Sequence, residues 1–550
     1  SRKKYSKTFP YYLARRDAED PDYIYLIPQS EESIWSVSTG WDKNRKVYME
    51  FGIDYNRTFG LHKTTALILY NQSKYYSPSL QYYVPNAYQG LVGRLTYEYA
   101  SRYLAEFNMG YNGTENFAKG KRFGFFPAVS LGWVISEEKF FPKNNIVKYL
   151  KVRGSYGEVG NDQIGGDRFL YLPSSYGAAS DSGVNKYNFG LASNPYTSLM
   201  IVENKIGNPD LTWEKAKKMN VGVDINLFNN CLTASFDIFK EKRNNILANR
   251  STSPMIIGAN LPAYNFGEME NRGWEMDLNF RHHIQDFHYW ARFNYSFARN
   301  EIIYMDEVQK RYDYQMTTGR RKNQFFGLIF DGYYTSWEEL NALGRPKSSW
   351  SGNQLQPGDV KYVDVNQDGV IDDYDMVPIG YTPVPEIIYG FSFGAQYKGF
   401  DFSVTTYGAF GAQVARSWRK FSDGQYENYT TEVYDYWHGE GTSNRYPLLA
   451  PGNSGQNFQA ISDIYIDDAD YVRIQNLTIG YDFKRIWKNC PFQQLRVYAA
   501  AQNLFTFTGY KGMDRENGRA LNDKEPWVTG VDVGNYPQPR TYMVGVNVIF

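Results

Sequence analysis

The chain has 550 residues, and its 59 basic and 59 acidic residues give a formal net charge of zero. This balance argues against proteins that bind nucleic acids or anionic surfaces through a basic excess. The mean hydropathy is −0.56, and no apolar run approaches the roughly 20 residues that a membrane helix needs. Membrane-spanning β-strands are not excluded by this hydropathy, because only every second residue of such a strand is apolar.

Strands are predicted wherever apolar and polar residues alternate with a period of two. In one example, Val221, Val223 and Ile225 face away from the residues between them, Gly222 and Asp224. Marking every such run predicts sixteen strands, near 34–41, 46–59, 63–71, 88–99, 102–113, 123–135, 147–157, 217–228, 231–241, 271–283, 287–299, 387–397, 401–411, 471–484, 494–505 and 540–550. The pattern predicts an all-β protein.

The last strand shows the pattern most clearly and ends on an aromatic residue. One face carries Tyr542, Val544, Val546, Val548 and Phe550. The opposite face carries Thr541, Gly545 and Asn547, and only Met543 and Ile549 interrupt its small, polar character. A strand with one apolar and one polar face suits the wall of a barrel that separates lipid from a wet lumen.

The connections between the predicted strands alternate between long and short. Counted back from Phe550, the long ones are 506–539, 412–470, 300–386, 242–270 and 158–216, and the short ones are 485–493, 398–400, 284–286, 229–230 and 136–146. Alternate connections of an antiparallel meander lie at opposite ends, so short turns meet at one end and long loops at the other, as in outer-membrane barrels. The N-terminal third fits less cleanly, because 42–45 is short where a long loop is due.

Two long segments interrupt the meander. The first, 158–216, is rich in Gly, Ser, Asn and Tyr and is typical of an irregular surface loop. The second, 300–386, has room for local structure. Within it, 336–343 predicts a short helix that Ser336 would cap at its N-terminus.

Several short motifs resemble the SusC-like family of TonB-dependent outer-membrane transporters. They are Ser155–Asp162 (SYGEVGND), Gly207–Lys215 (GNPDLTWEK), Met269–Glu275 (MENRGWE), Tyr471–Tyr481 (YVRIQNLTIGY), Ala501–Phe505 (AQNLF) and Tyr536–Arg540 (YPQPR). Each is short, but their number and order make the resemblance specific, and it covers nearly the whole chain.

The resemblance implies a transmembrane antiparallel β-barrel of 22 strands in the bacterial outer membrane, with a plug domain inside the lumen. It also implies a SusD-like surface lipoprotein that closes over the barrel, and energy from the TonB complex of the inner membrane. The imported ligands of the family are glycans or oligopeptides. The expected function is therefore active import of large nutrients.

The front of the chain departs from this family pattern, since it contains no plug domain, N-terminal extension or energy-coupling segment. Sixteen strands leave about six of the implied 22 unaccounted for, and an open sheet would expose two edges to lipid. We therefore expect residues 1–550 to form the C-terminal portion of the barrel. Two alternatives are a complete sixteen-strand diffusion porin and a soluble, secreted β-rich carbohydrate-binding protein.

A calcium-loop pattern lies within the second long loop, at 364–375. Its six candidate ligands stand at loop positions one, three, five, seven, nine and twelve, with Val370 offering its backbone carbonyl: Asp364, Asn366, Asp368, Val370, Asp372 and Asp375. Gly369 supplies the turn at position six, and an aspartate replaces the usual glutamate at twelve. The expected ion is structural and would pin the 300–386 loop.

The sequence contains no recognisable catalytic arrangement. The five histidines form no zinc-binding pair, and neither a nucleophile elbow nor a phosphate loop is present. We therefore expect a transporter that carries out no covalent chemistry. Its lumen would be lined by acidic residues of the polar strand faces, including Glu50, Asp54, Asp224, Asp237, Glu275 and Asp277.

Overall fold

The computed structural model describes most of the chain. The described residues are 2–6, 12–16, 24–28, 36–40, 43–80, 83–162, 168–178, 186–191, 196–199, 201–250, 252, 261–349, 355–416, 434–443, 445–449, 462–487, 489–512, 514, 516, 530–532 and 537–550. Parts of the predicted loops 158–216, 412–470 and 506–539 lie outside these ranges. Among the described residues, no helix has the length and hydrophobicity that a membrane crossing needs.

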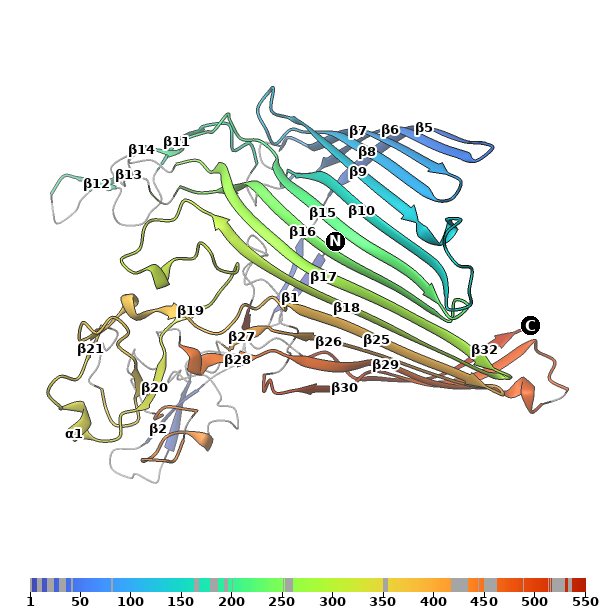
Figure 1. Ribbon diagram of the computed structural model, residues 1–550. Coiled ribbons are helices and arrows are strands. Elements are labelled where there is room, and N and C mark those ends of the chain that lie inside the picture. Colours follow the sequence, from blue (N-terminus) through green and yellow to red (C-terminus); the bar gives the residue numbers. More distant parts are fainter. Residues whose placement is uncertain are drawn as a thin grey trace.

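One antiparallel sheet of fifteen strands dominates the described structure, and it curves along its whole width (Figure 1). Each strand pairs with the next one of this series along the chain, so the sheet is an uninterrupted meander. Its strands are β5 (Arg45–Phe59), β6 (His62–Tyr76), β7 (Asn86–Tyr99), β8 (Tyr103–Thr114), β9 (Phe123–Val134), β10 (Val147–Asn161), β15 (Glu214–Leu227), β16 (Leu232–Ala248), β17 (Tyr264–Ile284), β18 (Phe287–Tyr304), β25 (Ile387–Tyr397), β26 (Phe400–Phe410), β29 (Tyr471–Asp482), β30 (Gln494–Thr508) and β32 (Thr541–Ile549). We call this sheet the wall.

The wall confirms fifteen of the sixteen predicted strands and corrects the remaining one. Residues 34–41 were expected to begin the meander, but β4 (Ser36–Gly40) pairs with β1 (Arg2–Ser6) in a separate two-stranded sheet. Five residues are too few for a tilted membrane strand, which needs about nine to eleven. The short segment 42–45 is therefore not a connection within the wall, and this removes the irregularity in the predicted alternation.

The two ends of the wall differ as predicted. At one end the connections have between two and twelve residues, and at the other between eight and 82 residues, the longest being 305–386. In Figure 1 the short turns and the C-terminus lie at the right, and the small strands and helix of the long loops lie at the left. The fold is thus an outer-membrane type of wall with short periplasmic turns and long extracellular loops.

The cross-strand register separates the two faces of the wall. One row across five neighbouring strands is polar and consists of Lys151, Asp224, Ser235, Asp277 and Asn294. The adjacent row, one residue along each strand, is apolar and consists of Val152, Val223, Phe236, Met276 and Tyr295. Side chains of neighbouring rows point to opposite faces, so the predicted polar and apolar faces are confirmed for these strands.

The long loops carry the compact part of the molecule. Loop 305–386 contains β19 (Phe326–Gly327), β20 (Phe330–Tyr333), α1 (Trp337–Leu340), β21 (Lys347–Ser348), β22 (Val360–Tyr362), β23 (Val370–Ile371) and β24 (Val377–Pro378). The predicted helix is confirmed as the single turn α1. Ser336 caps it, as predicted, because its side chain accepts a hydrogen bond from the Glu339 amide. A buried cluster around Leu328, Val360 and Ile371 also includes Trp437 of loop 411–470, which joins the two loops.

The remaining elements are short. The strands are β2 (Tyr12–Arg16), β3 (Ile24–Pro28), β11 (Ser174–Ala178), β12 (Lys186–Phe189), β13 (Tyr196–Leu199), β14 (Ile201–Lys205), β27 (Gln413–Arg416), β28 (Ile466–Asp468) and β31 (Val531–Asp532). The 3₁₀ turns are η2 (Ile135–Glu137), η4 (Asp313–Gln315), η5 (Asp373–Asp375), η8 (Asp463–Tyr465) and η9 (Phe483–Arg485). Strand β27 pairs with β28 and β31, so loops 411–470 and 509–540 are also joined.

The face assignment gives a first prediction. Leu278 lies on the apolar face, in register with Ala234 and Phe293 and six residues before Ile284 at the short-turn end of β17. Replacing Leu278 with Arg in the membrane-inserted protein should lower its free energy of unfolding by about 2–4 kcal/mol, the cost of a guanidinium in the middle of the bilayer. Urea titration in lipid vesicles measures this loss.

Ser296→Arg is the matched control, because Ser296 lies on the polar face and its hydroxyl donates to Glu275 at 3.3 Å. An added guanidinium there has an acidic partner, so we expect little change. A larger loss for Ser296→Arg than for Leu278→Arg would reverse the two faces.

Candidate functional site

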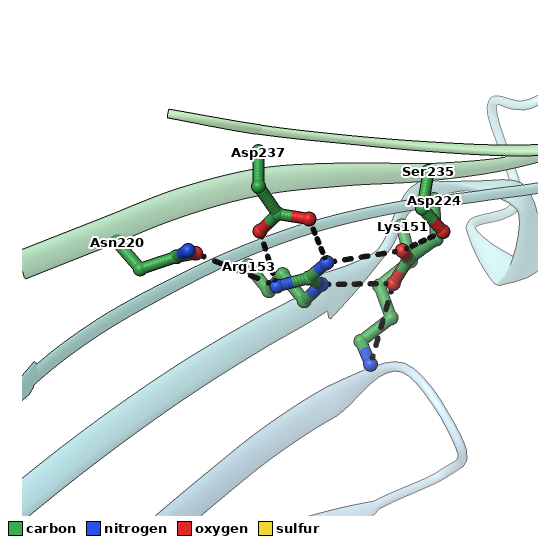
Figure 2. A network of polar contacts seen from close by, with 6 residues as sticks. All are labelled: Lys151, Arg153, Asn220, Asp224, Ser235 and Asp237. Carbon is green, nitrogen blue, oxygen red and sulfur yellow. Dashed lines mark hydrogen bonds and ion pairs between the residues drawn. The ribbon is translucent and has the colours of Figure 1, made fainter. Parts of the chain in front are cut away.

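The polar face of the wall is the candidate functional site, because ion pairs cross it from strand to strand. Figure 2 shows one such group, centred on Arg153 of β10. The Arg153 guanidinium donates to both carboxylate oxygens of Asp237, at 2.7 and 2.6 Å, and to Asp224 at 3.1 and 3.4 Å. Ser235 donates to Asp224 at 2.9 Å. Two of the acidic residues predicted for the lumen therefore share one cation.

A glycine makes this arrangement possible. Arg153 on β10 and Asp237 on β16 both lie opposite Gly222 on the intervening strand β15. A Cβ atom on Gly222 would lie 2.5 Å from Asp237 Oδ1 and 2.8 Å from Arg153 Cζ. The missing side chain leaves a gap through which the guanidinium and the carboxylate meet across two strand spacings.

A similar arrangement occurs near the β32 edge of the wall. Asp401 on β26 lies opposite Gly480 on β29, whereas Arg496 on β30 lies opposite Asp482, two residues further along β29. The guanidinium contacts the carboxylate at 2.7 and 2.5 Å, and a Cβ on Gly480 would lie 2.5 Å from Asp401 Oδ1. Bidentate pairs of this kind are geometrically specific, so each glycine fixes a position at which three strands are clamped together.

Further ion pairs line the same face at single strand spacings. Arg94 contacts Glu106 at 2.9 Å, and Arg292 contacts Asp277 at 2.9 Å. The predicted lumen residues Asp224, Asp237, Glu275 and Asp277 lie together on β15, β16 and β17, whereas Glu50 and Asp54 lie apart from them on β5. A surface with this density of charge is suited to water, not to lipid.

Sequence reasoning identified the acidic residues but missed their basic partners and the two glycines. Alternation shows that a residue lies on the polar face, but not which residues of other strands lie beside it. The signal that could have found them is an Arg and an Asp on the two strands that flank one glycine, at its register or two residues from it. That register is fixed only when the turns close.

The predicted calcium segment is an ordered loop whose polar groups are largely used within the loop. Asp364 Oδ2 accepts from the Gly369 amide at 2.8 Å, and the Asn366 side chain contacts Asp368 at 3.0 Å. Gly369 has a φ of +83°, as position six requires. Hydrogen bonds therefore join loop position one to six and position three to five.

One atom of this segment fits a cation, and one residue does not. Asp364 Oδ1 is buried and has no hydrogen-bond partner among the residues that the structure describes. Asp375, in contrast, accepts the amides of Val365, Asn366 and Asp372 at 2.8, 3.3 and 2.9 Å, so its two oxygens already hold the loop together. Burial raises the pKa of Asp375. Among the described residues, no three Asp, Glu, His or Cys side chains converge as a preformed metal site.

The spanning ion pair gives the second prediction. In the membrane-inserted protein, Gly222→Ala should lower the free energy of unfolding by about 1–2 kcal/mol, because the new Cβ separates charged partners whose hydrogen bonds contribute about 1.5–3 kcal/mol when fully buried. The expected loss is smaller than the contribution of these hydrogen bonds, because the Arg153 side chain is 32% exposed and solvent screens its charge.

Gly154→Ala is the matched control for this experiment. A Cβ on Gly154 meets only one atom within 4 Å, the Asn220 carbonyl oxygen at 3.9 Å. We expect this variant to be neutral or slightly stabilising. Equal losses for the two alanine variants would show that Gly222 has no part in the ion pair.

Comparisons with known proteins agree with this geometry. Residues 3–377 match the family model described as "TonB dependent receptor-like, beta-barrel". TonB-dependent receptor P3 of Formosa agariphila is 29% identical over 471 residues, which cover 83% of this chain and 45% of that protein. TonB-dependent receptor SusC of Bacteroides thetaiotaomicron is 28% identical over 494 residues, which cover 85% of this chain and 44% of that protein.

The fold is also that of a solved transporter. The structure of the RagAB peptide transporter superposes with a TM-score of 0.69 at 20% identity, covering 92% of this chain and 56% of that one. The chain thus spans less than half the length of the curated relatives it matches. The family match, the two-faced wall and the loop arrangement agree, and the chain belongs to the TonB-dependent receptor-like β-barrel family of the bacterial outer membrane.

Proposed function

We propose that the chain forms most of the wall of a TonB-dependent importer for large nutrients, working with a SusD-like surface lipoprotein. The observation that carries this proposal is the polar face of the wall, crossed by ion pairs, in a chain of the TonB-dependent receptor family. A wet inner face gives a polar ligand a path across the membrane. The proposed cargo is glycans or oligopeptides, as the resemblance to the SusC-like family implies, and a solved structure of the same fold is described as a peptide transporter.

The edges of the wall support closure by further strands. The edge strands β5 and β32 both run from the long-loop end to the short-turn end, because fifteen antiparallel strands separate into eight of one direction and seven of the other. Direct pairing of β5 with β32 would be parallel, whereas single-chain bacterial barrels have an even number of antiparallel strands. An odd number of additional strands closes the barrel, and the seven that remain of the implied 22 meet this condition. The plug-bearing part of the transporter would supply them.

The sheet edges and the apolar face distinguish the proposed importer from the alternatives. A complete diffusion porin would have to close with the strands of the wall alone. A soluble carbohydrate-binding protein would expose to water the apolar face that includes Val221, Ile238 and Phe236, at 58%, 57% and 41% exposure.

The proposed mechanism is gated import: a lipoprotein lid captures the ligand, the lumen receives it, and movement of the plug under TonB releases it. The wall carries out no covalent chemistry.

The third prediction concerns the assembly. Mass spectrometry of the complex purified in mild detergent from outer membranes should recover plug peptides, a surface lipoprotein and retained glycan or peptide. Uptake of that ligand by whole cells should cease when TonB is removed, because the proposed plug movement needs its energy. Recovery of this chain without plug and lid, or uptake that persists without TonB, would instead support passive diffusion.

We also propose that segment 364–375 holds a structural calcium ion, with Asp364, Asn366 and Asp368 as its main ligands. The unpartnered Asp364 Oδ1 atom supports this ligand set. An ion at this position would complete the coordination of a buried carboxylate oxygen and brace the loop next to Ile371, which lies in the hydrophobic cluster of loop 305–386.

The fourth prediction tests this ion. Chelation of calcium in the whole complex should speed limited proteolysis within 305–386 severalfold, and added calcium should restore protection. The Asp364→Asn variant should be cleaved as fast as the chelated protein, and added calcium should no longer slow its cleavage. Asp373→Asn, outside the predicted ligands, should still respond. Identical cleavage with and without calcium in the unaltered protein would exclude the ion.

A further inference from the structure

A row of three cations crosses the apolar face of the wall. Lys240 of β16 lies opposite Arg272 of β17, and Arg272 lies opposite Arg299 of β18. Their side chains share the face of Ile238, Trp274 and Phe297, which form the parallel row two residues closer to the short-turn end. Like charges directly opposite one another destabilise a sheet, so this row needs negative charge nearby.

Among the described residues, the two outer members of the row, Lys240 and Arg299, have a carboxylate partner. Lys240 contacts Glu270 at 2.8 Å, and Arg299 contacts Glu386 at 2.8 and 2.9 Å. Arg272 is exposed and makes no ion pair or hydrogen bond within the part of the chain that the structure describes. The middle cation is therefore free to bind an external anion, with a second cation on either side.

The height of the row matches the level of lipid headgroups. Ile284, at the short-turn end of β17, lies twelve residues after Arg272. At about 3.4 Å per residue and a strand tilt of about 45°, Arg272 stands about 29 Å above that end, just beyond an apolar band about 25 Å tall. Trp274, one step below, stacks on Tyr295 at 4.7 Å between ring centroids, as aromatic residues do at a membrane interface.

The surrounding charges leave the cations outermost. The Lys240 side chain is 54% exposed and its partner Glu270 only 17%, while Arg299 is 45% exposed and Glu386 13%. Further toward the loops, Lys217 contacts Glu158 at 3.9 Å and Lys242 contacts Glu268 at 2.9 Å. Glu301 of β18 lies opposite Glu270 and is half-buried. An approaching anion therefore meets the more exposed guanidinium and ammonium groups of the row first, with these carboxylates behind them.

We propose that Arg272, flanked by Lys240 and Arg299, binds a phosphate group of a phosphorylated glycolipid in the outer leaflet, of the lipid A type. A guanidinium binds phosphate through two parallel hydrogen bonds, and at the edge of the hydrocarbon such a pair is less screened than in water. The acyl chains of the same lipid would cover the apolar residues below the row. This site lies on the outside of the wall and is independent of the transported ligand.

Two matched variants of the whole complex test this site. Arg272→Gln and Arg292→Gln each remove one exposed guanidinium, but Arg292 lies on the polar face and pairs with Asp277. The complexes are purified in mild detergent, and the phosphorylated glycolipid retained per barrel is measured by native mass spectrometry. We expect about a tenfold loss for Arg272→Gln, the effect of one charge-assisted hydrogen bond, and no change for Arg292→Gln.

Exchange into defined lipid identifies the chemical group. The unaltered complex should retain added lipid A but not its dephosphorylated form, and millimolar inorganic phosphate should not displace the lipid. Equal retention of the two lipids, displacement by phosphate, or full retention by a correctly assembled Arg272→Gln complex would overturn the proposal. If Arg272→Gln does not assemble, Lys240→Gln tests the same row, with a loss expected and unchanged retention contradicting the site.

Discussion

Backbone hydrogen bonding is the constraint on which the rest of this structure depends. A strand in hydrocarbon has no water to satisfy its amides and carbonyls, so every strand needs a partner on both sides. The meander from β5 to β32 meets this requirement for each inner strand by pairing it with its two neighbours in the series. It also makes the two edges the points at which the barrel has to continue.

Once the strands are paired, their two faces meet different surroundings. The apolar rows face outward, and the polar rows collect charge that cannot remain unpaired at low dielectric. Ion pairs across the wall neutralise this charge, and in two cases a glycine on the middle strand allows the pair to span three strands. The same contacts that make the inner face suitable for polar ligands therefore also clamp neighbouring strands.

The loops are not subject to this constraint, because water can satisfy their backbone amides and carbonyls. Loops 305–386 and 411–470 build a small hydrophobic core of their own around Val360 and Trp437. Segment 364–375 is attached to that core through Ile371, which is 1% exposed. The described part of the loop end thus presents an ordered surface. On the outside of the wall, the Lys240–Arg272–Arg299 row marks the level at which the apolar band ends.

The sequence by itself determined what depends on near neighbours in the chain. A period of two predicted fifteen strands of the wall and both of their faces, the lengths of the connections predicted the two ends, and Ser336 predicted the start of α1. It could not determine what depends on register. The Arg153–Asp237 pair joins residues 84 positions apart, the Arg272 row joins three strands, and residues 36–40 follow the strand pattern without joining the wall. These features were decided by tertiary structure, because a local pattern fixes which face a side chain takes, whereas its neighbours on that face follow from how the whole sheet pairs.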